Sequence, residues 1–273
     1  MNKISFAKNY SGEKYLTFPF YQGGKTVDGA FWGMTLRSAG SMKFRWNEKN
    51  ENREKMLSKI CSDFGGKKIS QVQLDHTKLV FSVNDSSDTF EKIGDGIITK
   101  NPKLLPVVTV ADCVPIFLYE PETGFFGVVH SGWKGTGIVE NSINLARQKY
   151  GCDAGKICVA IGPHIRDCCY IVNSERADYF VKNFSASCVR KVESDEVFKG
   201  VLKNWNYGSG PLYHLSLLEA NLAVLKRAGI EEENIVVSTD CTCDLEMFGS
   251  NRRETSFGNT FTVQAAFTVR TGK

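Results

Sequence analysis

Short apolar runs separated by glycine, proline and acidic residues follow one another along most of the chain. The runs over 78–83, 105–110, 114–119 and 125–130 are rich in valine, isoleucine, leucine and phenylalanine, which favours β-strands. The second and third runs are separated at 111–113, and a Pro-Glu-Thr-Gly sequence before the fourth predicts a tight turn. This part of the chain therefore predicts four strands joined by short connections.

Two other segments repeat apolar side chains at helical spacing. Ile143 and Ala146 lie within a predicted helix over 139–150, which follows a glycine-rich loop. Four leucines indicate a second, amphipathic helix of about 14 residues that ends at Gly229. These leucines are Leu215, Leu218, Leu222 and Leu225.

Three more strands are predicted, at 156–161, 234–238 and 261–270. Strands and helices thus mix without a regular alternation of strand, helix and strand, and the chain contains neither repeats nor low-complexity linkers. This pattern is typical of an α+β fold with mixed β-sheets flanked by helices. We expect one domain that spans residues 1–273.

Composition and charge exclude several classes of protein. The chain is 42% apolar and 23% charged, which is ordinary for a globular protein. No apolar run approaches the roughly 18 residues of a membrane span. The net charge of +4 is not gathered into one run, and the densest basic stretch, 43–68, is expected to be a solvated surface helix. We therefore expect neither a nucleic acid nor a membrane as a partner.

The cysteines indicate a reducing environment. There are nine, an odd number, and the first six residues contain no apolar block typical of a signal peptide. Reduced thiols in the cytoplasm are therefore expected. Cys168-Cys169 and Cys241-Thr-Cys243 are not followed by a second ligand pair at zinc-finger spacing, so they are interpreted as structural thiols.

Three potential metal ligands lie at the ends of predicted strands. His76 precedes a strand, Cys113 lies at the break between two strands, and His130 ends a strand. One thiolate and two imidazoles form a ligand set that zinc accepts, with a fourth position left for water. The same residues also allow a metal-free interpretation, in which Cys113 is a nucleophile and His130 is its base. Both interpretations remain open on the sequence.

Two further segments carry groups suited to binding an anionic or aromatic ligand. The glycine-rich loop 131–137 contains Trp133 and Lys134 and precedes a helix, whose amino end favours anions. Trp133 offers a face on which a base can stack. Arg252 and Arg253 are adjacent and can clamp a phosphate or a carboxylate.

Read together, these segments resemble one family. The resemblance rests on six motifs that occur in the same order over about residues 40–265. They are Asn52-Arg53, Gly94-Asp-Gly-Ile-Ile-Thr99, Val110-Ala-Asp-Cys-Val-Pro-Ile116, His130-Ser-Gly-Trp-Lys-Gly135, Ile161-Gly-Pro-His-Ile165 with Cys168-Cys169-Tyr170, and Asp240-Cys-Thr242 with Phe248-Gly-Ser-Asn-Arg-Arg253. The chain is identified as resembling the YfiH-type, laccase-domain family, also named multicopper polyphenol oxidoreductase and more recently described as a purine nucleoside phosphorylase family.

The resemblance implies a metal site and a substrate site. It implies metal ligation by His76, Cys113 and His130, which would then also be the catalytic residues. It implies phosphorolysis of adenosine, inosine, guanosine and methylthioadenosine, together with adenosine deamination. Phosphate and nucleoside would be met by five residues, namely Arg53, Trp133, Lys134, Arg252 and Arg253. Lys134 stands where the family usually has arginine.

The family's names leave the chemistry open, and the histidine count favours zinc. A multicopper centre needs many imidazole ligands, and the chain has only four histidines. We therefore expect one catalytic zinc ion, with weak copper-dependent oxidation as an alternative. A second alternative is cysteine- or metal-dependent hydrolysis of peptidoglycan precursors, and a third is a regulatory partner protein without catalysis.

Overall fold

Two β-sheets stacked face to face form the body of the protein. The computed structural model describes residues 1–196, 198 and 200–271. The larger sheet has seven strands, in the order β1 (Asn2–Ile4), β14 (Ile235–Ser238), β10 (Cys158–Ile161), β8 (Val114–Glu120), β9 (Phe125–Ser131), β6 (Gly96–Thr99) and β5 (Val80–Val83). The second has five, in the order β2 (Tyr15–Gln22), β3 (Lys25–Thr35), β15 (Gln264–Arg270), β7 (Leu104–Val110) and β4 (Lys68–Gln71).

The central strand β8 shows why its sequence is almost continuously apolar. Successive side chains of a strand point to opposite faces. Phe117 and Tyr119 pack between the two sheets with Trp32, whereas Ile116 and Leu118 pack against helices on the outer face. A strand covered on both faces carries apolar residues at every position.

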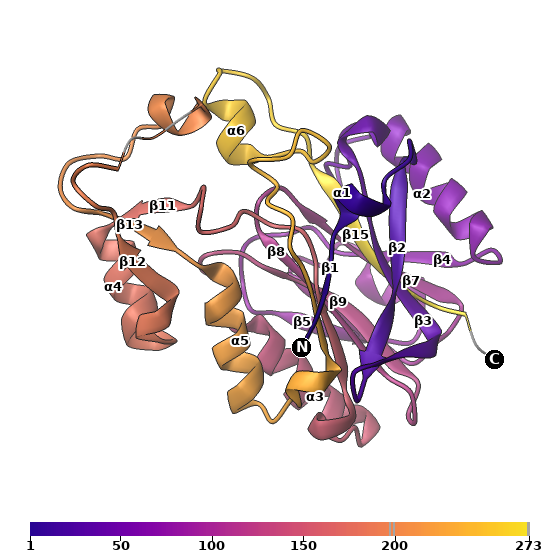
Figure 1. The fold of residues 1–273 in the computed structure, drawn as a ribbon. Helices are drawn as coiled ribbons and strands as arrows, with labels where there is room; N and C mark the ends of the chain where they lie inside the picture. Colours follow the sequence, from indigo (N-terminus) through magenta and orange to yellow (C-terminus); the bar gives the residue numbers. More distant parts are fainter. Residues whose placement is uncertain (197, 199, 272–273) are drawn as a thin grey trace.

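Helices cover the outer face of each sheet (Figure 1). Two of them, α3 (Ile138–Tyr150) and α5 (Leu217–Arg227), pack on the seven-stranded sheet. On the other side, α2 (Glu51–Asp63) packs on the five-stranded sheet through Met56 and Leu57. The short helices α1 (Phe6–Asn9) and α6 (Asn251–Thr255) lie in loops.

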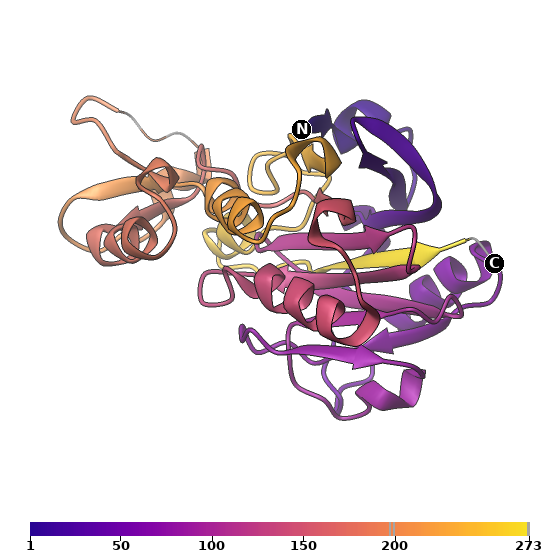
Figure 2. The same ribbon diagram turned by 90° about the horizontal axis from the view of Figure 1, so that it is seen from below.

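A small lobe projects from the end of the stacked sheets (Figure 2). It contains a three-stranded sheet in the order β11 (Ile171–Asn173), β13 (Leu212–Leu215) and β12 (Val189–Lys191), and the helix α4 (Ser174–Asn183). Its Tyr170–Asn173 end lies next to the stacked sheets, so this lobe can contribute side chains to a site at that edge.

The structure confirms the predicted α+β class with mixed sheets, and all seven predicted strands have a counterpart. The boundaries of a single domain at 1–273 stay a prediction. Two predicted helices, now α3 and α5, are also present, but α5 begins after its cap Ser216, whose hydroxyl accepts from Glu219 N at 3.2 Å. The predicted helix residue Leu215 therefore belongs to β13.

Other sequence-based expectations held only in part or missed an element. Of the basic stretch 43–68, only Glu51–Asp63 is helical; this surface helix exposes its charged face, but its other face is buried against the five-stranded sheet. The hairpin of β2 and β3 was missed, because glycine, threonine and charged residues interrupt its apolar alternation.

Candidate active site

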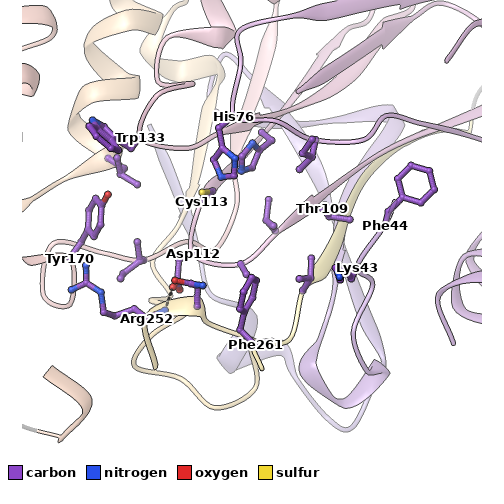
Figure 3. Close-up of a pocket in the computed structure, with 18 of the residues that line it drawn as sticks. Lys43, Phe44, His76, Thr109, Asp112, Cys113, Trp133, Tyr170, Arg252 and Phe261 are labelled. Atoms are coloured by element: carbon purple, nitrogen blue, oxygen red, sulfur yellow. Dashed lines mark hydrogen bonds between the residues drawn. The ribbon is translucent and has the colours of Figure 1, made fainter. Parts of the chain in front are cut away.

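A cavity of about 580 Å³ opens where the two sheets, the loop around α6 and the small lobe meet. Figure 3 shows its labelled side chains, with His76 and Cys113 between Trp133 and Tyr170 on one side and Lys43 and Phe44 on the other. The chain passes from the five-stranded sheet to the seven-stranded sheet at 111–113, so this turn lies at the junction. Loops at the ends of packed strands are common places for functional side chains.

The three potential ligands come together in this cavity. The ligand atoms of His76, Cys113 and His130 all lie within 4.8 Å of one another. The antiparallel pairing of β8 with β9 produces this proximity, because Pro115 near the start of β8 pairs with His130 near the end of β9. His76 enters from the loop between β4 and β5, and the two imidazole rings meet edge to face with centroids 4.9 Å apart.

Asp95 holds two of these residues in place. Its Oδ1 lies 2.8 Å from His130 Nδ1 and also accepts from the backbone N of His76 at 3.0 Å. Thr77 donates to the other carboxylate oxygen through its backbone N at 2.6 Å and its hydroxyl at 2.7 Å. These bonds support the left-handed backbone of His76, which has φ 54°. With Nδ1 engaged, Nε2 of His130 is the nitrogen left to act as a ligand or base.

Asp95 is a functional residue that was not predicted from the sequence. It lies within the motif Gly94–Thr99, where it stands between two glycines directly before a buried strand. An acidic residue at such a position is the signal that could have identified it. Its hydrogen bond to His130 could not be predicted, because the two residues are 35 positions apart in the chain.

Gly132 explains part of the glycine-rich loop. A Cβ at this position would lie 2.9 Å from Cys113 Sγ and 3.1 Å from His76 Cδ2. Such contacts are too close for a side chain, so glycine leaves the space beside the three ligand atoms open. One sulfur and two nitrogen donors around an open space form a ligand set that suits a zinc or a copper ion.

Cys113, His130 and Asp95 shift one another's pKa values. Burial would raise the pKa of the Cys113 thiol, but the neighbouring His130 and His76 outweigh burial and lower the pKa to about 7. Burial would likewise lower the pKa of His130, but Cys113 and Asp95 raise it to about 10. Hydrogen bonds and charge from His130, with those from Thr77, outweigh burial and lower the pKa of Asp95. The thiol can therefore deprotonate near neutral pH, as both a metal ligand and a nucleophile require.

Aromatic and cationic side chains line the lobe side of the cavity. The Arg176 guanidinium lies over the ring of Trp133, 3.9 Å from its centroid, and donates to the Tyr170 hydroxyl at 3.1 Å. Arg252 lies over Trp205 at 4.1 Å and donates to the carbonyl of Ile171 at 3.2 Å. This side of the cavity thus offers flat apolar faces beside positive charge.

Asp112, next to Cys113 in the chain, also lines the cavity. Its carboxylate accepts from the backbone N of Arg252 at 2.6 Å and from the Thr242 hydroxyl at 2.7 Å. Burial outweighs these bonds and raises the pKa of Asp112. A carboxyl group with a raised pKa is suited to donating or accepting a proton.

Three predicted substrate-binding residues do not line the cavity. Arg53 is buried and donates to the carbonyl of Met42, with its guanidinium over Phe44. Arg253 is buried and donates to backbone carbonyls, which are those of Thr242, Cys243, Leu245 and Phe248. Lys134 is exposed outside the cavity. Trp133 and Arg252 do line it, and the structure adds the cations Lys43, Arg45 and Arg176.

The fold and the cavity together define an α+β protein with a centre of two histidines and one cysteine, a combination typical of zinc and copper sites. The chain belongs to the family described as multi-copper polyphenol oxidoreductase laccase, which it matches over residues 40–266. This match confirms the resemblance noted from the motifs.

Three relatives are similar in sequence. Purine nucleoside phosphorylase LACC1 from Mus musculus is 30% identical over 76% of this chain and 44% of its own length. Purine nucleoside phosphorylase YlmD from Geobacillus stearothermophilus is 35% identical over 59% of this chain and 55% of its own length. Adenosine deaminase RL5, from an unknown prokaryotic organism, is 33% identical over 62% of this chain and 60% of its own length. The alignments thus span roughly half the length of the first two relatives.

Two solved structures share the fold. Bacillus licheniformis YfiH superposes with a TM-score of 0.74 at 24% identity, covering 88% of this chain and 92% of the other. YlmD from Geobacillus stearothermophilus gives a TM-score of 0.72 at 25% identity, covering 93% and 100%. Among the described residues, no helix has the length and apolar character that would cross a membrane.

Proposed function

We propose that this protein is a zinc-dependent purine nucleoside enzyme. In this proposal it splits adenosine, inosine, guanosine and methylthioadenosine with phosphate and also deaminates adenosine. The observation that carries the proposal is the convergence of His76, Cys113 and His130 in a cavity that also presents aromatic faces and cations. The names of the relatives, purine nucleoside phosphorylase and adenosine deaminase, give the proposed reactions.

The residues of the cavity fit the needs of these reactions. His76, Cys113 and His130 would hold the zinc ion, which would act as a Lewis acid and lower the pKa of a bound water. Trp133 presents a face for the purine, and Arg252 and Arg176 supply positive charge for phosphate. Asp112 lines the same cavity, and in this proposal its carboxyl group exchanges a proton with the purine, the role an acidic residue has in zinc deaminases.

A multicopper mechanism is not supported by the other two histidines. His164 is fully buried, and its Nδ1 lies 2.7 Å from the carbonyl of Gly162. The imidazole of His214 lies 2.8 Å from the carbonyl of Asp167 and 2.7 Å from the Glu196 carboxylate. Within residues 1–196, 198 and 200–271, no second group of potential ligands contains a histidine. Oxidation of a phenolic dye is therefore expected to be slow and to need added copper.

One observation favours a second candidate, a cysteine hydrolase. The lowered pKa of Cys113 and the interaction of its thiol with His130 also suit a nucleophile beside its base. This candidate needs neither zinc nor phosphate, so both can be used to separate the two mechanisms.

The test measures release of free purine base by chromatography. Adenosine and inosine are incubated with the protein, with and without phosphate, and before and after removal of metal by a chelator. We expect base release to require phosphate and metal, and inosine or hypoxanthine to form from adenosine. Equal release in phosphate-free buffer, or full activity without metal, would contradict the proposal and favour the cysteine hydrolase.

Alanine variants of the adjacent Arg252 and Arg253 are expected to differ in their effect on the KM for phosphate. Arg252→Ala removes a cation from the cavity wall as well as the donor to the carbonyls of Cys169 and Ile171. It is expected to lower the free energy of unfolding too, but in the folded variant to raise the KM for phosphate ten- to a hundredfold, because a charged hydrogen bond contributes about 1.5–3 kcal/mol. Arg253→Ala leaves buried carbonyls without a donor and is expected to lower the free energy of unfolding by about 2–4 kcal/mol. Phosphate kinetics and urea unfolding measure the two effects. The reverse pattern, with Arg253→Ala folding normally but requiring more phosphate, would restore the sequence-based assignment.

Trp133 is expected to stack on the purine. Trp133→Ala is expected to raise the KM for nucleoside five- to a hundredfold, because stacking of a base on an aromatic ring contributes about 1–3 kcal/mol. Trp133→Phe keeps an aromatic face and serves as the matched control, with a smaller change. Unchanged steady-state kinetics of Trp133→Ala would mean that the ring only packs against Arg176.

A further inference from the structure

A second group of thiols lies outside the cavity described above. Cys168 and Cys169 are in the turn before β11, and Cys241 and Cys243 follow β14. The sulfur atoms of Cys168, Cys169 and Cys241 all lie within 4.8 Å of one another. Cys241, which the sequence separates from the Cys168-Cys169 pair by about 70 residues, therefore meets that pair in one cluster.

The spacing of the sulfurs matches a metal centre better than a disulfide. The Sγ atoms of Cys168 and Cys169 are 3.7 Å apart, and all nine cysteines are unpaired. Ligands about 2.3 Å from a tetrahedral zinc ion lie about 3.8 Å from one another. The sulfurs of a disulfide are only about 2.05 Å apart.

The backbone around the cluster is already arranged. His164 and Cys241 form a parallel bridge, which fixes the Cys168 segment against the Cys241 segment. The backbone N of Arg166 donates to the Cys241 sulfur at 3.4 Å, an interaction that favours a thiolate. Such preorganisation lowers the entropy cost of gathering ligands around an ion.

The cluster is also reachable from solvent. Cys169 and Cys241 are buried, whereas Cys168 is exposed. A cavity of about 320 Å³ opens beside Cys168 and Cys241, and the carboxylate-bearing Asp244 lines it. An ion could thus enter from this side, and a fourth ligand could come from the same cavity.

We propose that Cys168, Cys169 and Cys241 form a second metal site, which binds one zinc ion through three thiolates. Binding forms three Zn–S bonds and releases three thiol protons to solvent, with no change of oxidation state. Soft thiolate ligands select zinc over magnesium or calcium. The cavity beside Cys168 and Cys241, which Asp244 also lines, would supply the fourth ligand.

The position of this site indicates a structural role beside the active site. Thr242, between Cys241 and Cys243, donates to the carboxylate of Asp112 at 2.7 Å. Its carbonyl accepts from the Arg253 guanidinium at 2.6 Å. A metal ion that holds this turn would therefore hold the hydrogen bond from Thr242 that orients the Asp112 carboxylate at the wall of the active-site cavity. The second site thus goes beyond the proposed nucleoside chemistry and does not depend on it.

The first experiment counts zinc in protein purified under reducing conditions without added metal. Wild-type protein is expected to hold about two equivalents, Cys113→Ser about one, and the double variant Cys113→Ser/Cys168→Ser close to none. Cys188→Ser removes a buried cysteine outside both groups and is the matched control, expected to keep about two. Circular dichroism verifies that each variant is folded. Because Cys168 is exposed, its serine variant is the one least expected to disturb folding.

The second experiment reads the ligands directly. Cobalt(II) added to metal-free Cys113→Ser is expected to give the near-ultraviolet absorption of cobalt–thiolate bonds, and Cys168→Ser in that background is expected to lose most of it. In the wild type, Cys168 is expected to resist iodoacetamide until a chelator is added. Three results would overturn the proposal. Cys113→Ser could contain no zinc and give no cobalt–thiolate band, Cys168 of the wild type could be alkylated at once, or two of these cysteines could form a disulfide in the reduced preparation. Failure of nucleoside turnover alone would leave these readouts unchanged.

Discussion

Replacing Cys113 by serine is expected to reduce nucleoside turnover by about a thousandfold or more, a loss of roughly 4 kcal/mol of transition-state stabilisation. Cys113 is the sulfur donor among the three converging ligands, and its thiol has a pKa lowered to about 7. A serine hydroxyl at the same place stays protonated at neutral pH and binds zinc poorly. The loss should therefore appear in both the metal content and the activity.

The measurement combines metal analysis with base release in phosphate buffer. Zinc is expected to fall by about one equivalent relative to wild type, the amount held by a single site. Cys152→Ser is the matched control and is expected to retain activity. Cys152 is buried, does not line the cavity, and its thiol shares a hydrogen bond with the Thr123 hydroxyl. If Cys113→Ser loses activity but keeps its full zinc content, Cys113 is a nucleophile and not a ligand.

Replacing Asp95 by asparagine is expected to weaken metal binding and turnover ten- to a hundredfold. The carboxylate fixes His130 through Nδ1 at 2.8 Å and accepts from the backbone N of His76, but Asp95 does not itself line the cavity. Asp95 is thus a positioning residue. Asparagine keeps the size of the side chain but removes the charge that raises the pKa of His130.

This change also predicts a pH effect in the metal-free protein. The pKa of His130 is raised to about 10 by Cys113 and Asp95 against the opposing effect of burial, so Asp95→Asn is expected to lower it. Titration of the imidazole by NMR after metal removal reads this shift, which loss of stability alone would not produce. Asp75→Asn alters an exposed acid next to His76 and is the matched control. An unchanged His130 titration would show that Asp95 acts on the fold only.

The large elements of the fold could be predicted because their signals are local. The seven predicted strands of the stacked sheets each carry an apolar run of their own, and α3 carries apolar residues at helical spacing. The hairpin of β2 and β3 could not be read in this way, because its inward-facing residues are separated by glycines and polar positions whose burial depends on the neighbouring sheet.

The candidate ligands could also be found in the sequence, whereas their supporting residues could not. His76, Cys113 and His130 stand out because histidine is rare and each residue lies at a strand end. Asp95 and Arg176 are common amino acid types, and only Asp95, between two glycines before a buried strand, carries a local signal. Their roles follow only from the pairing of β6 with β9 and from the place of the small lobe.

The two arginines and the cysteine cluster show most directly what the sequence determines and what only the tertiary structure determines. The sequence by itself determined the fold class, the family and the three candidate ligands, because periodicity and residue chemistry are properties of short segments. The tertiary structure decided that both arginines are buried and donate to backbone carbonyls, and that only Arg252 also lines the cavity. It also decided that Cys168 and Cys241 meet. Adjacent residues can lie in different environments, and residues distant in the chain can be in contact. The reason is that strand register and packing across the whole chain determine the position of each side chain.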